Sequence, residues 1–237
     1  MIDTVLFDLD GTLLPMDQEE FLNLYMSLLA KKLAPHGYEP NHLIAGVWAG
    51  TKAMVENNGE KTNAEVFWED FCHTFGADAR KDAPIFEEFY AADFAHVRTV
   101  CPMEPAAAEV VAMLKGRGVT LGLATNPLFP EIATRQRIRW AGLDPEDFDC
   151  ITTYEDSRHC KPNPAYYRDV LRMLGKEPEQ CIMVGNDVAE DMVSARCVGM
   201  EVFLLTPCMI NKKNLDINQF PHGDFAELKR FLEEKTR

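Results

Sequence analysis

Short apolar runs alternate with stretches of helical periodicity along most of this chain. Residues 4–7 (TVLF) form an unbroken run of β-branched and apolar side chains, which is typical of a strand buried on both faces of a parallel sheet. The same reasoning predicts further strands at 119–124, 150–153, 181–184 and 202–205, and helices at 106–115, 131–140, 165–174, 190–197 and 224–235. Strands that alternate with helices form βαβ units. The pattern therefore predicts an α/β fold with a Rossmann-like parallel sheet core and helices on both of its faces.

Residues 17–98 follow a different pattern, which we call the helical insert. Apolar residues recur there at helical spacing, for example Phe21, Tyr25, Leu28 and Leu29, and no strand pattern occurs. We predict an all-helical cap of about four helices, inserted after the first strand. The core domain is then formed by residues 1–16 and 99–237.

Glycines and prolines divide the helical insert into its helices. The segment from Gly46 to Gly50 predicts a break, which places Trp48, Gly50 and Lys52 in a loop. Such a loop would contact a bound leaving group if it dipped towards the core, and the plain helix connection is the favoured interpretation. The aromatic residues of this region are interpreted as packing residues: Trp68, Phe71, Phe75, Phe86, Phe89 and Tyr90.

The charge of the chain limits the partners that it can bind. It has 24 Lys and Arg against 38 Asp and Glu, a formal net charge of −14. Nucleic-acid binding depends on clustered Lys and Arg, and docking on anionic membrane does too, so neither partner is expected. An anionic small molecule stays possible, because one metal ion and one lysine reverse the local field. A monomer or homodimer is equally compatible with this composition.

The cysteines and the N-terminus bear on the compartment. The seven cysteines are odd in number and form no CxxC pair, which fits neither a disulfide framework nor a zinc site. The first residues lack the basic stretch and cleavage site of a signal peptide. No apolar stretch reaches the roughly 20 residues that span a bilayer. We therefore expect a cytoplasmic protein with reduced thiols.

Polar residues follow four of the predicted strands. Asp8 and Asp10 end the first strand, with Gly11 permitting a turn that brings both carboxylates to one site. Two adjacent acids suit Mg²⁺, and they also suit covalent catalysis with one nucleophile and one general acid/base. Thr125 and Asn126 follow the second strand and are able to hold phosphate oxygens.

The third and fourth strand ends supply the remaining charges. Lys161 follows the third strand, and a lysine suits the neutralisation of a phosphoryl oxygen or a carboxylate. The segment GNDVAED follows the fourth strand and contains an acidic cluster that suits an Mg²⁺ shell. In open α/β sheets ligands bind beyond the carboxyl ends of the strands, so these residues are expected to share one site. His159, two residues before Lys161, is a candidate for the border of that site.

The order of these motifs resembles the haloacid dehalogenase (HAD) superfamily, most of whose members are Mg²⁺-dependent phosphatases. DLDGTLL carries the resemblance most specifically, GNDVAED supports it, and Thr125 and Lys161 match in order and spacing. The helical insert resembles a type C1 cap, which selects the substrate in that family. The resemblance implies hydrolysis of a small phosphomonoester.

The resemblance also implies a role for each matching residue. Asp8 matches the nucleophile that forms an aspartyl-phosphate, and Asp10 matches the general acid/base. Thr125 and Lys161 match the phosphate-binding and charge-neutralising positions, and Asn126, beside Thr125, is a further candidate for substrate binding. Mg²⁺ would be held by the Asp8 carboxylate, the Asp10 carbonyl and the acidic motif.

The acidic motif departs from the family pattern at its first position. Asn186 stands where an Asp usually follows the glycine of the strand end. Either Asn186 through its amide oxygen or Asp187 directly would complete the metal site. We favour Asp187, with Asn186 beside it and Asp191 in the outer shell.

Three other functions remain as alternatives. A phosphomutase of the β-phosphoglucomutase type shares the core and the cap, so the sequence does not separate it from a phosphatase. A dehalogenase lacks an acid at the position of Asp10 and needs no metal, which argues against it. A non-catalytic binding protein is disfavoured because Asp8, Asp10, Thr125 and Lys161 are all present.

Overall fold

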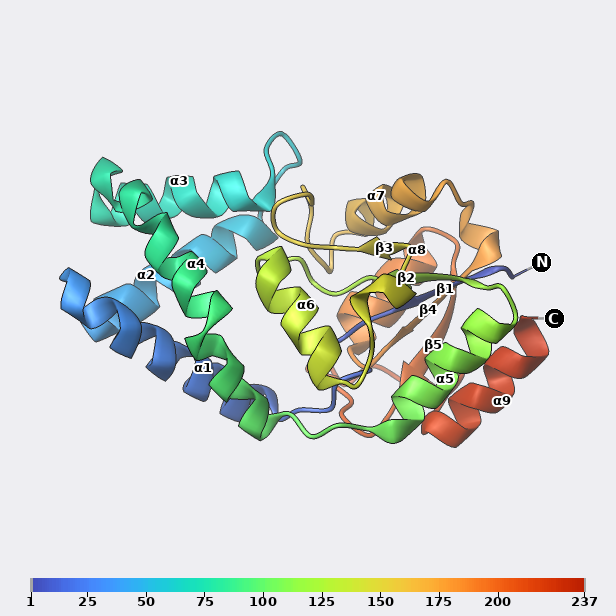
Figure 1. Cartoon of the computed structure of the whole chain (residues 1–237). Coiled ribbons are helices and arrows are strands. Elements are labelled where there is room, and N and C mark those ends of the chain that lie inside the picture. The colour runs from blue at the N-terminus through green and yellow to red at the C-terminus, as the bar shows by residue number, and fades with distance from the viewer. Residues whose placement is uncertain (1, 237) are drawn as a thin grey trace.

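A parallel sheet lies at the centre of the computed structural model, which describes residues 2–236 (Figure 1). Its strand order is β3-β2-β1-β4-β5-β6, and every neighbouring pair is parallel. The strands are β1 (Thr4–Phe7), β2 (Thr120–Leu123), β3 (Cys150–Ile151), β4 (Cys181–Gly185), β5 (Glu201–Leu205) and β6 (His222–Gly223). The strand order reverses direction at β1, so the switch point of the sheet lies beside the end of its first strand.

Helices cover both faces of this sheet. Those that follow the helical insert are α5 (Pro105–Gly116), α6 (Glu131–Trp140), α7 (Pro164–Leu174), α8 (Ser194–Cys197) and α9 (Phe225–Lys235). Helices α5 and α9 pack together on one face, and α7 and α8 on the other (Figure 1). A π-helical turn, η6 (Val188–Val193), leads from the end of β4 into α8.

Alternate residues of the strands point into two separate cores. Val5 and Phe7 of β1 belong to a cluster that also contains Leu228 of α9. Leu6, between them, belongs to the cluster that contains Tyr166 and Tyr167 of α7. Because side chains of a strand alternate between its faces, a continuous apolar run is needed when both faces are covered.

The helical insert forms the part of the molecule farthest from both termini (Figure 1). Its α-helices are α1 (Gln18–Leu33), α2 (Pro40–Val55), α3 (Asn63–Phe75) and α4 (Ala83–Ala91). Short 3-10 helices separate them or follow them: η1 (Ala34–His36), η2 (Ala77–Asp82) and η3 (Asp93–Val100). Local signals set the helix starts, since Asp17 caps α1 and a capping box of Thr62 and Glu65 caps α3.

Helices α2 and α3 make a close contact that depends on two glycines. A Cβ atom at Gly46 would lie 2.3 Å from the Phe75 ring, and one at Gly50 would lie 2.6 Å from the Phe67 ring. Glycine costs about 1 kcal/mol in a helix interior relative to alanine. Here that cost is offset by the two phenylalanine rings that pack directly on the α2 backbone.

The start of α3 is hydrogen-bonded to core loops far away in the sequence. The Asn63 N–H donates to the Ser157 carbonyl at 2.8 Å, and the Ala64 N–H donates to the Tyr154 carbonyl at 2.8 Å. The Asn63 side-chain amide also donates to the Pro127 carbonyl at 3.2 Å and contacts the Cys160 sulfur. We call this set of contacts the Asn63 junction. It joins the helical insert to the core at a point remote from the covalent connections.

Most of the predicted elements are confirmed. The α/β class, the parallel sheet and the helices on both faces are as expected, and the predicted helix at 131–140 coincides with α6. The predicted break at Gly46–Gly50 is wrong, because these residues lie inside α2. The helix expected from residue 190 instead begins as η6 at Val188, and the two-residue strand β6 was not predicted.

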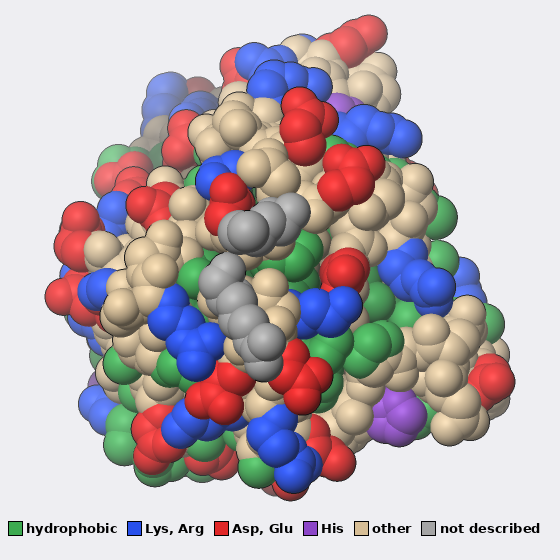
Figure 2. Space-filling view, turned by 90° about the vertical axis from the view of Figure 1, so that its right-hand side faces the viewer, with side chains coloured by type: hydrophobic (Ala, Val, Ile, Leu, Met, Phe, Trp, Pro, Cys, Tyr) green, Lys and Arg blue, Asp and Glu red, His purple; other side chains and the backbone are tan. Residues whose placement is uncertain are grey.

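The surface carries its acidic surplus without one extended patch on the face near the termini. Figure 2 shows acidic and basic side chains interspersed there, outside the part covered by grey atoms. All seven cysteines are free thiols. Within residues 2–236, none of the helices has the length and apolar composition required to cross a bilayer.

Candidate active site

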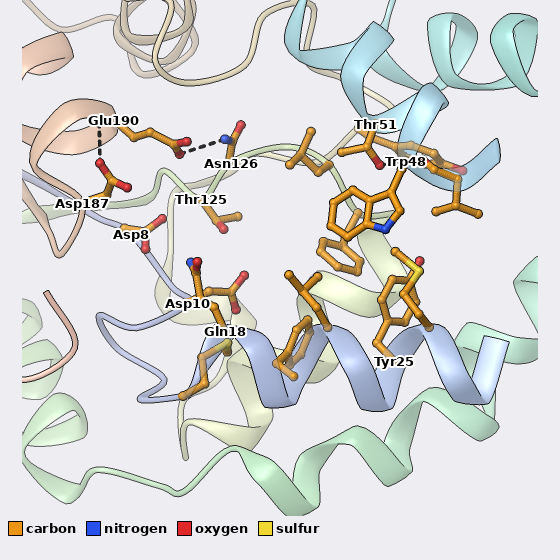
Figure 3. Close-up of a pocket in the computed structure, with 18 of the residues that line it drawn as sticks. Asp8, Asp10, Gln18, Tyr25, Trp48, Thr51, Thr125, Asn126, Asp187 and Glu190 are labelled. Carbon is orange, nitrogen blue, oxygen red and sulfur yellow. Dashed lines mark hydrogen bonds between the residues drawn. The ribbon is translucent and has the colours of Figure 1, made fainter. Parts of the chain in front are cut away.

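A cavity of about 380 Å³ lies between the carboxyl ends of the strands and the helical insert (Figure 3). One end is lined by polar residues of the core, which we call the floor: Asp8, Asp10, Thr125, Asn126, Asn186, Asp187, Glu190 and Asp191. The other end is lined by residues of α1 to α4, which we call the roof: Gln18, Phe21, Leu22, Tyr25, Met26, Val47, Trp48, Thr51, Phe67, Trp68, Phe86 and Tyr90. The floor residues follow β1, β2 and β4, which are three of the strand ends where polar residues were predicted.

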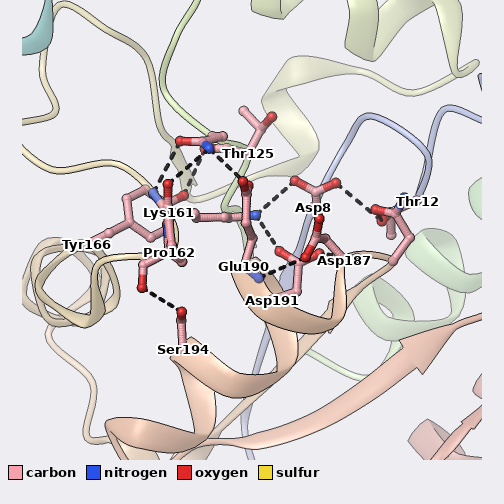
Figure 4. Close-up of polar contacts among 12 residues, drawn as sticks. Asp8, Thr12, Thr125, Lys161, Pro162, Tyr166, Asp187, Glu190, Asp191 and Ser194 are labelled. Carbon is pink, nitrogen blue, oxygen red and sulfur yellow. Dashed lines mark hydrogen bonds and ion pairs between the residues drawn. The ribbon is translucent and has the colours of Figure 1, made fainter. Parts of the chain in front are cut away.

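Lys161 lies behind the floor and links two of its carboxylates (Figure 4). Its Nζ donates to Asp8 Oδ1 at 2.9 Å and to Asp191 Oδ1 at 2.7 Å, and its side chain is only 1% exposed. The loop that carries it is tied to the start of α8, because Ser194 Oγ donates to the Pro162 carbonyl at 2.6 Å. The ammonium group is therefore held in place from two elements.

Burial and charge act on this group of residues in opposite directions. Burial raises the pKa of Asp8 to about 7, the Asp191 and Asp10 carboxylates raise it as well, and the Lys161 ammonium opposes the shift. Burial alone would lower the pKa of Lys161, but the carboxylates of Asp191 and Asp8 hold it well above its ordinary value. The lysine thus stays cationic beside a carboxylate that is costly to ionise without it.

Asp10 is paired with a buried arginine that the sequence did not single out. Its Oδ2 accepts a hydrogen bond from Arg137 of α6, which is fully buried. The guanidinium carbon lies 4.3 Å from the centre of the Phe129 ring and the group also contacts Thr134 at 3.3 Å. Among residues 2–236, nothing hydrogen-bonds to Asp10 Oδ1, although this atom is buried. One oxygen of Asp10 is therefore fixed, and the other is free for a further partner.

Thr125 and Asn126 follow β2 as predicted and have different environments. The Thr125 carbonyl accepts hydrogen bonds from Thr152 at 2.7 Å and Tyr166 at 2.9 Å, so its backbone is fixed while its side chain lines the cavity. The Asn126 side chain donates to Glu190 Oε2 at 3.0 Å and accepts from the Lys161 N–H at 3.2 Å. Asn126 therefore connects the second, third and fourth strand ends.

Asn186 and Asp187 are engaged by the protein to different extents. The Asn186 amide nitrogen donates to the Cys208 carbonyl at 2.8 Å, and its amide oxygen accepts from Thr12 at 3.0 Å. Gly11, at φ 83°, leaves room for this side chain, since a Cβ there would lie 2.3 Å from the amide nitrogen. Asp187 Oδ1 accepts from the N–H groups of Ala189 and Glu190, and its second oxygen makes no hydrogen bond within residues 2–236.

Burial also shifts the titration of Glu190. Burial raises its pKa to about 7, with Lys161 opposing the shift and the Asp191 and Asp187 carboxylates adding to it. Burial thus disfavours the ionised form of two floor acids, Asp8 and Glu190. The Lys161 ammonium behind them favours the ionised form of both.

One roof element, α2, differs from the prediction for this part of the helical insert. Trp48 lies in α2 and not in a loop, yet its side chain and that of Thr51 reach the cavity opposite Tyr25 of α1 (Figure 3). Phe71 and Phe89 are buried packing residues as expected, whereas Trp68, Phe86 and Tyr90 also line the cavity. His159 does not line it, and its Nδ1 pairs with Asp169 at 2.6 Å.

The structure brings all of the predicted site residues to one edge of the sheet. Asp8, Asp10, Thr125, Asn126 and Asp187 line the cavity, Asn186 does so beside them, and Lys161 lies directly behind Asp8. Two functional contacts were not predicted: Arg137 on Asp10, and Thr12, which hydrogen-bonds to Asn186 and lies 3.3 Å from Asp8 Oδ2. Within residues 2–236, no group of three or more His, Cys, Asp and Glu side chains has a metal-holding arrangement.

The sequence of the chain is similar to those of known hydrolases. Residues 2–199 match the family model of the haloacid dehalogenase-like hydrolases. The chain is 27% identical over 200 residues to the pyrophosphatase PpaX of Bacillus cereus (strain AH820), which covers 84% of this chain and 80% of that protein. It is 24% identical over 200 residues to the phosphoglycolate phosphatase of Aquifex aeolicus (strain VF5), with 84% and 83% covered.

The fold is also similar to that of a solved dehalogenase. The 2-haloacid dehalogenase from Pseudomonas syringae pv. Tomato DC3000 superposes with a TM-score of 0.65 at 21% identity, covering 99% of this chain and 100% of that one. At this identity the likeness concerns the fold alone. The reaction has to be argued from the residues of the site.

Proposed function

The chain belongs to the haloacid dehalogenase-like hydrolases, and from that membership and the geometry of the floor we propose that it is a Mg²⁺-dependent phosphatase. It hydrolyses a small-molecule phosphomonoester through an aspartyl-phosphate intermediate. The helical insert, residues 17–98, acts as a cap that selects the substrate. The observation that carries this proposal is the buried Lys161, held between Asp8 and Asp191 beside the cavity. A buried cation beside a candidate nucleophile suits a reaction in which an anionic carboxylate must approach an anionic phosphate group.

In the first step Asp8 attacks the phosphorus atom. The bond from phosphorus to the leaving oxygen breaks, and the leaving oxygen receives a proton from Asp10. Lys161 and the Thr125 side chain bind phosphoryl oxygens and offset their charge. Asp10 Oδ1, which is buried and has no hydrogen-bond partner within residues 2–236, is the oxygen assigned to carry the proton.

In the second step water hydrolyses the aspartyl-phosphate. Asp10 takes a proton from the water as its oxygen attacks phosphorus, and the bond from phosphorus to Asp8 breaks. Inorganic phosphate leaves and the Asp8 carboxylate is restored. Arg137 keeps the Asp10 side chain in one position through both steps, because its guanidinium is fixed by burial and by the Phe129 ring.

The donor atoms at the floor fit Mg²⁺. The Asp8 carboxylate, the Asp10 carbonyl and the free oxygen of Asp187 are hard oxygen ligands from three positions of two strand ends. We assign the metal to Asp187 rather than to Asn186, because both polar atoms of the Asn186 amide already bond to protein groups. Bound Mg²⁺ would reduce the repulsion between the phosphoryl group and Asp8.

Asp10 argues against a dehalogenase. An acid that protonates a leaving oxygen has no role in the displacement of a halide, which leaves without a proton. The pairing of Asp10 with a buried arginine would be a costly feature to retain without a function.

The direct test is release of phosphate from p-nitrophenyl phosphate. We expect turnover with Mg²⁺ and its loss in excess chelator, restored by added Mg²⁺. Thr125→Val, which keeps the side-chain volume and removes the hydroxyl, is expected to weaken phosphate binding. Turnover that is unaffected by chelator would contradict the assignment of the metal, and no turnover on a broad panel of phosphate esters would contradict the proposed function.

A further inference from the structure

The roof of the cavity carries no charged side chain. Of the cavity-lining residues between positions 17 and 98, all described by the structure, none is Asp, Glu, Lys or Arg. The cation that lines the cavity, Lys212, is an exposed residue of the core and follows Ile210 near Asp187. The floor beside it holds several acids. An anionic leaving group would thus face neutral rings on one side and carboxylates on the other.

The polar groups of the roof stay neutral. The Tyr25 and Tyr90 hydroxyls hydrogen-bond to each other at 2.8 Å. Burial raises the pKa of Tyr25 to about 12 and holds that of Tyr90 well above its ordinary value. The Thr51 hydroxyl donates to the Val47 carbonyl of its own helix at 2.8 Å. These three hydroxyls are engaged within the protein, so the roof offers a polar leaving group the neutral Gln18 amide and, among the described residues, no charged partner.

The remaining apolar roof residues are five aromatic ones, Phe21, Trp48, Phe67, Trp68 and Phe86, and three aliphatic ones, Leu22, Met26 and Val47. Phe67 and Trp68 pack edge to face at 5.6 Å, Trp68 and Phe86 at 5.3 Å, and Phe129 of the core contacts Tyr25 at 5.4 Å. These rings are arranged around a cavity whose volume of about 380 Å³ is at the lower end of small-ligand sites. An aromatic ring that packs offset or edge-on against such residues gains about 0.5–1.5 kcal/mol beyond the area that it buries.

Trp48 is the exposed member of this set. Its side chain is 44% exposed, whereas Trp68 and Phe67 are nearly buried. Figure 3 shows its indole projecting into the cavity from α2 towards Tyr25. A ring that is left open to solvent at the edge of a cavity gains contact area when a flat group fills the space beside it.

We propose that the substrate is a phosphate monoester of an uncharged aromatic alcohol, whose ring lies between Trp48 and the aromatic residues of the roof. This inference rests on the proposed phosphatase function. It separates the chain from the substrates named for the two relatives described above, since pyrophosphate and phosphoglycolate both carry a second anionic group beside the phosphate that is released. The same lack of a cation on the roof disfavours a phosphomutase, whose bisphosphate intermediate needs a second phosphate site.

The test compares primary alkyl phosphates, so that the leaving oxygens are of similar basicity. The esters are benzyl phosphate, cyclohexylmethyl phosphate, methyl phosphate and phosphoglycolate, with pyrophosphate as a further anionic substrate. With Mg²⁺ present, kcat/KM for benzyl phosphate is expected to exceed that for phosphoglycolate by at least about tenfold and that for cyclohexylmethyl phosphate by a smaller factor. Phosphoglycolate or pyrophosphate as the better substrate overturns the inference, and Lys212→Ala then shows whether that residue binds the second charge.

Two substitutions at one position test the assigned partner of the ring. Trp48→Ala is expected to lower the ratio of kcat/KM for benzyl phosphate to that for methyl phosphate by about tenfold, mainly through KM. Trp48→Phe keeps a ring and is expected to retain most of that ratio. An unchanged ratio in Trp48→Ala overturns the role of Trp48. Absence of phosphate release from every ester would instead count against the proposed function itself.

Discussion

The floor and the roof of the cavity are built on different principles. On the floor, charged and polar side chains are held by specific hydrogen bonds, as Lys161 is by Asp8 and Asp191. On the roof, neutral rings are held by packing, and the Tyr25 and Tyr90 hydroxyls bond to each other. The floor is therefore suited to one reaction with fixed geometry. The roof is suited to recognising the shape of whatever is attached to the reacting group.

The difference also concerns how each side tolerates change. A buried polar network loses several interactions when one member is removed, because its partners are left unsatisfied. An aromatic wall loses contact area in proportion to the atoms removed. Substitutions on the floor should therefore abolish chemistry, while substitutions on the roof should redistribute substrate preference.

The largest effect is expected at Asp8. Asp8→Asn keeps the volume and removes the proposed nucleophile, so kcat should fall by roughly 10³–10⁶-fold. Lys161 retains Asp191 as a partner, and the fold should persist. Phosphate release and circular dichroism measure the two properties. Asp3→Asn, at an acid directly before the same strand, is the control and should keep full activity; substantial turnover in Asp8→Asn would mean that the nucleophile is a different residue.

A smaller loss is expected at Asp10. Asp10→Asn removes the proton donor and acceptor, so the rate should fall by about 10²–10⁴-fold. The loss should be greater for benzyl phosphate than for p-nitrophenyl phosphate, because an alkoxide needs the proton more than a stabilised phenolate does. Steady-state kinetics on both esters give this comparison. Equal losses on the two esters would argue that Asp10 positions groups without transferring a proton.

The pH dependence of stability reports on the buried acids of the floor. The pKa of Glu190 is raised to about 7 from an ordinary 4.5, so the folded state binds more protons than the unfolded state between these values. Stability from this group is present below the ordinary pKa and is lost as pH rises towards 7. Glu190→Gln should therefore gain about 1–3 kcal/mol of unfolding free energy relative to the parent protein between about pH 5 and about pH 8.

Denaturant unfolding in excess chelator measures this difference. Asp8 shifts in the same direction, so some pH dependence should remain in Glu190→Gln. Glu60→Gln, at an exposed acid of the helical insert, controls for the loss of one charge. Identical pH profiles for Glu190→Gln and the parent would show that Glu190 does not titrate in this range.

The smallest effects are expected in the packing behind the roof. Gly46→Ala and Gly50→Ala each place a methyl group against a phenylalanine ring of α3, and each should lower the unfolding free energy by about 1–2 kcal/mol. Only Phe67, beside Gly50, lines the cavity. Gly50→Ala should therefore also raise KM for benzyl phosphate by a few-fold, which Gly46→Ala should not. A shared change in KM would indicate that the whole insert shifts.

The floor was predictable because strand ends have a simple geometry. The carboxyl ends of parallel strands meet at one edge of the sheet, so polar residues directly after each strand had to lie close together. Asp8, Thr125, Lys161 and Asp187 follow this rule. Their order along the chain was enough to place them before any distance was known.

Arg137 escaped prediction because its partner is distant in sequence and its helix contains other arginines. Arg135 and Arg139 are more exposed, and all three look alike as residue types. Spacing was the available signal: Arg137 lies on the same helical face as the buried residues Ala133, Thr134 and Ile138. A charged residue on an apolar face needs a buried counter-charge, and Asp10 supplies it.

The roof was harder to predict because glycine either interrupts a helix or allows two helices to pack closely. Gly46 and Gly50 were interpreted as helix breakers, which is their usual effect in isolation. In the folded chain they are the sites of closest approach between α2 and α3. That role depends on Phe67, 17 residues after Gly50, and on Phe75, 29 residues after Gly46, and local periodicity cannot connect residues so far apart.

The Asn63 junction has a mechanical consequence for the helical insert. The chain crosses between core and insert twice, before α1 and after η3, and the junction adds a further attachment at Ser157, Tyr154 and Pro127. The junction therefore opposes rotation of the insert about the two chain crossings. Rotation of the whole insert requires rupture of the junction, so a ligand that enters with the junction intact must pass through local displacement of side chains at the mouth, among them the exposed Trp48.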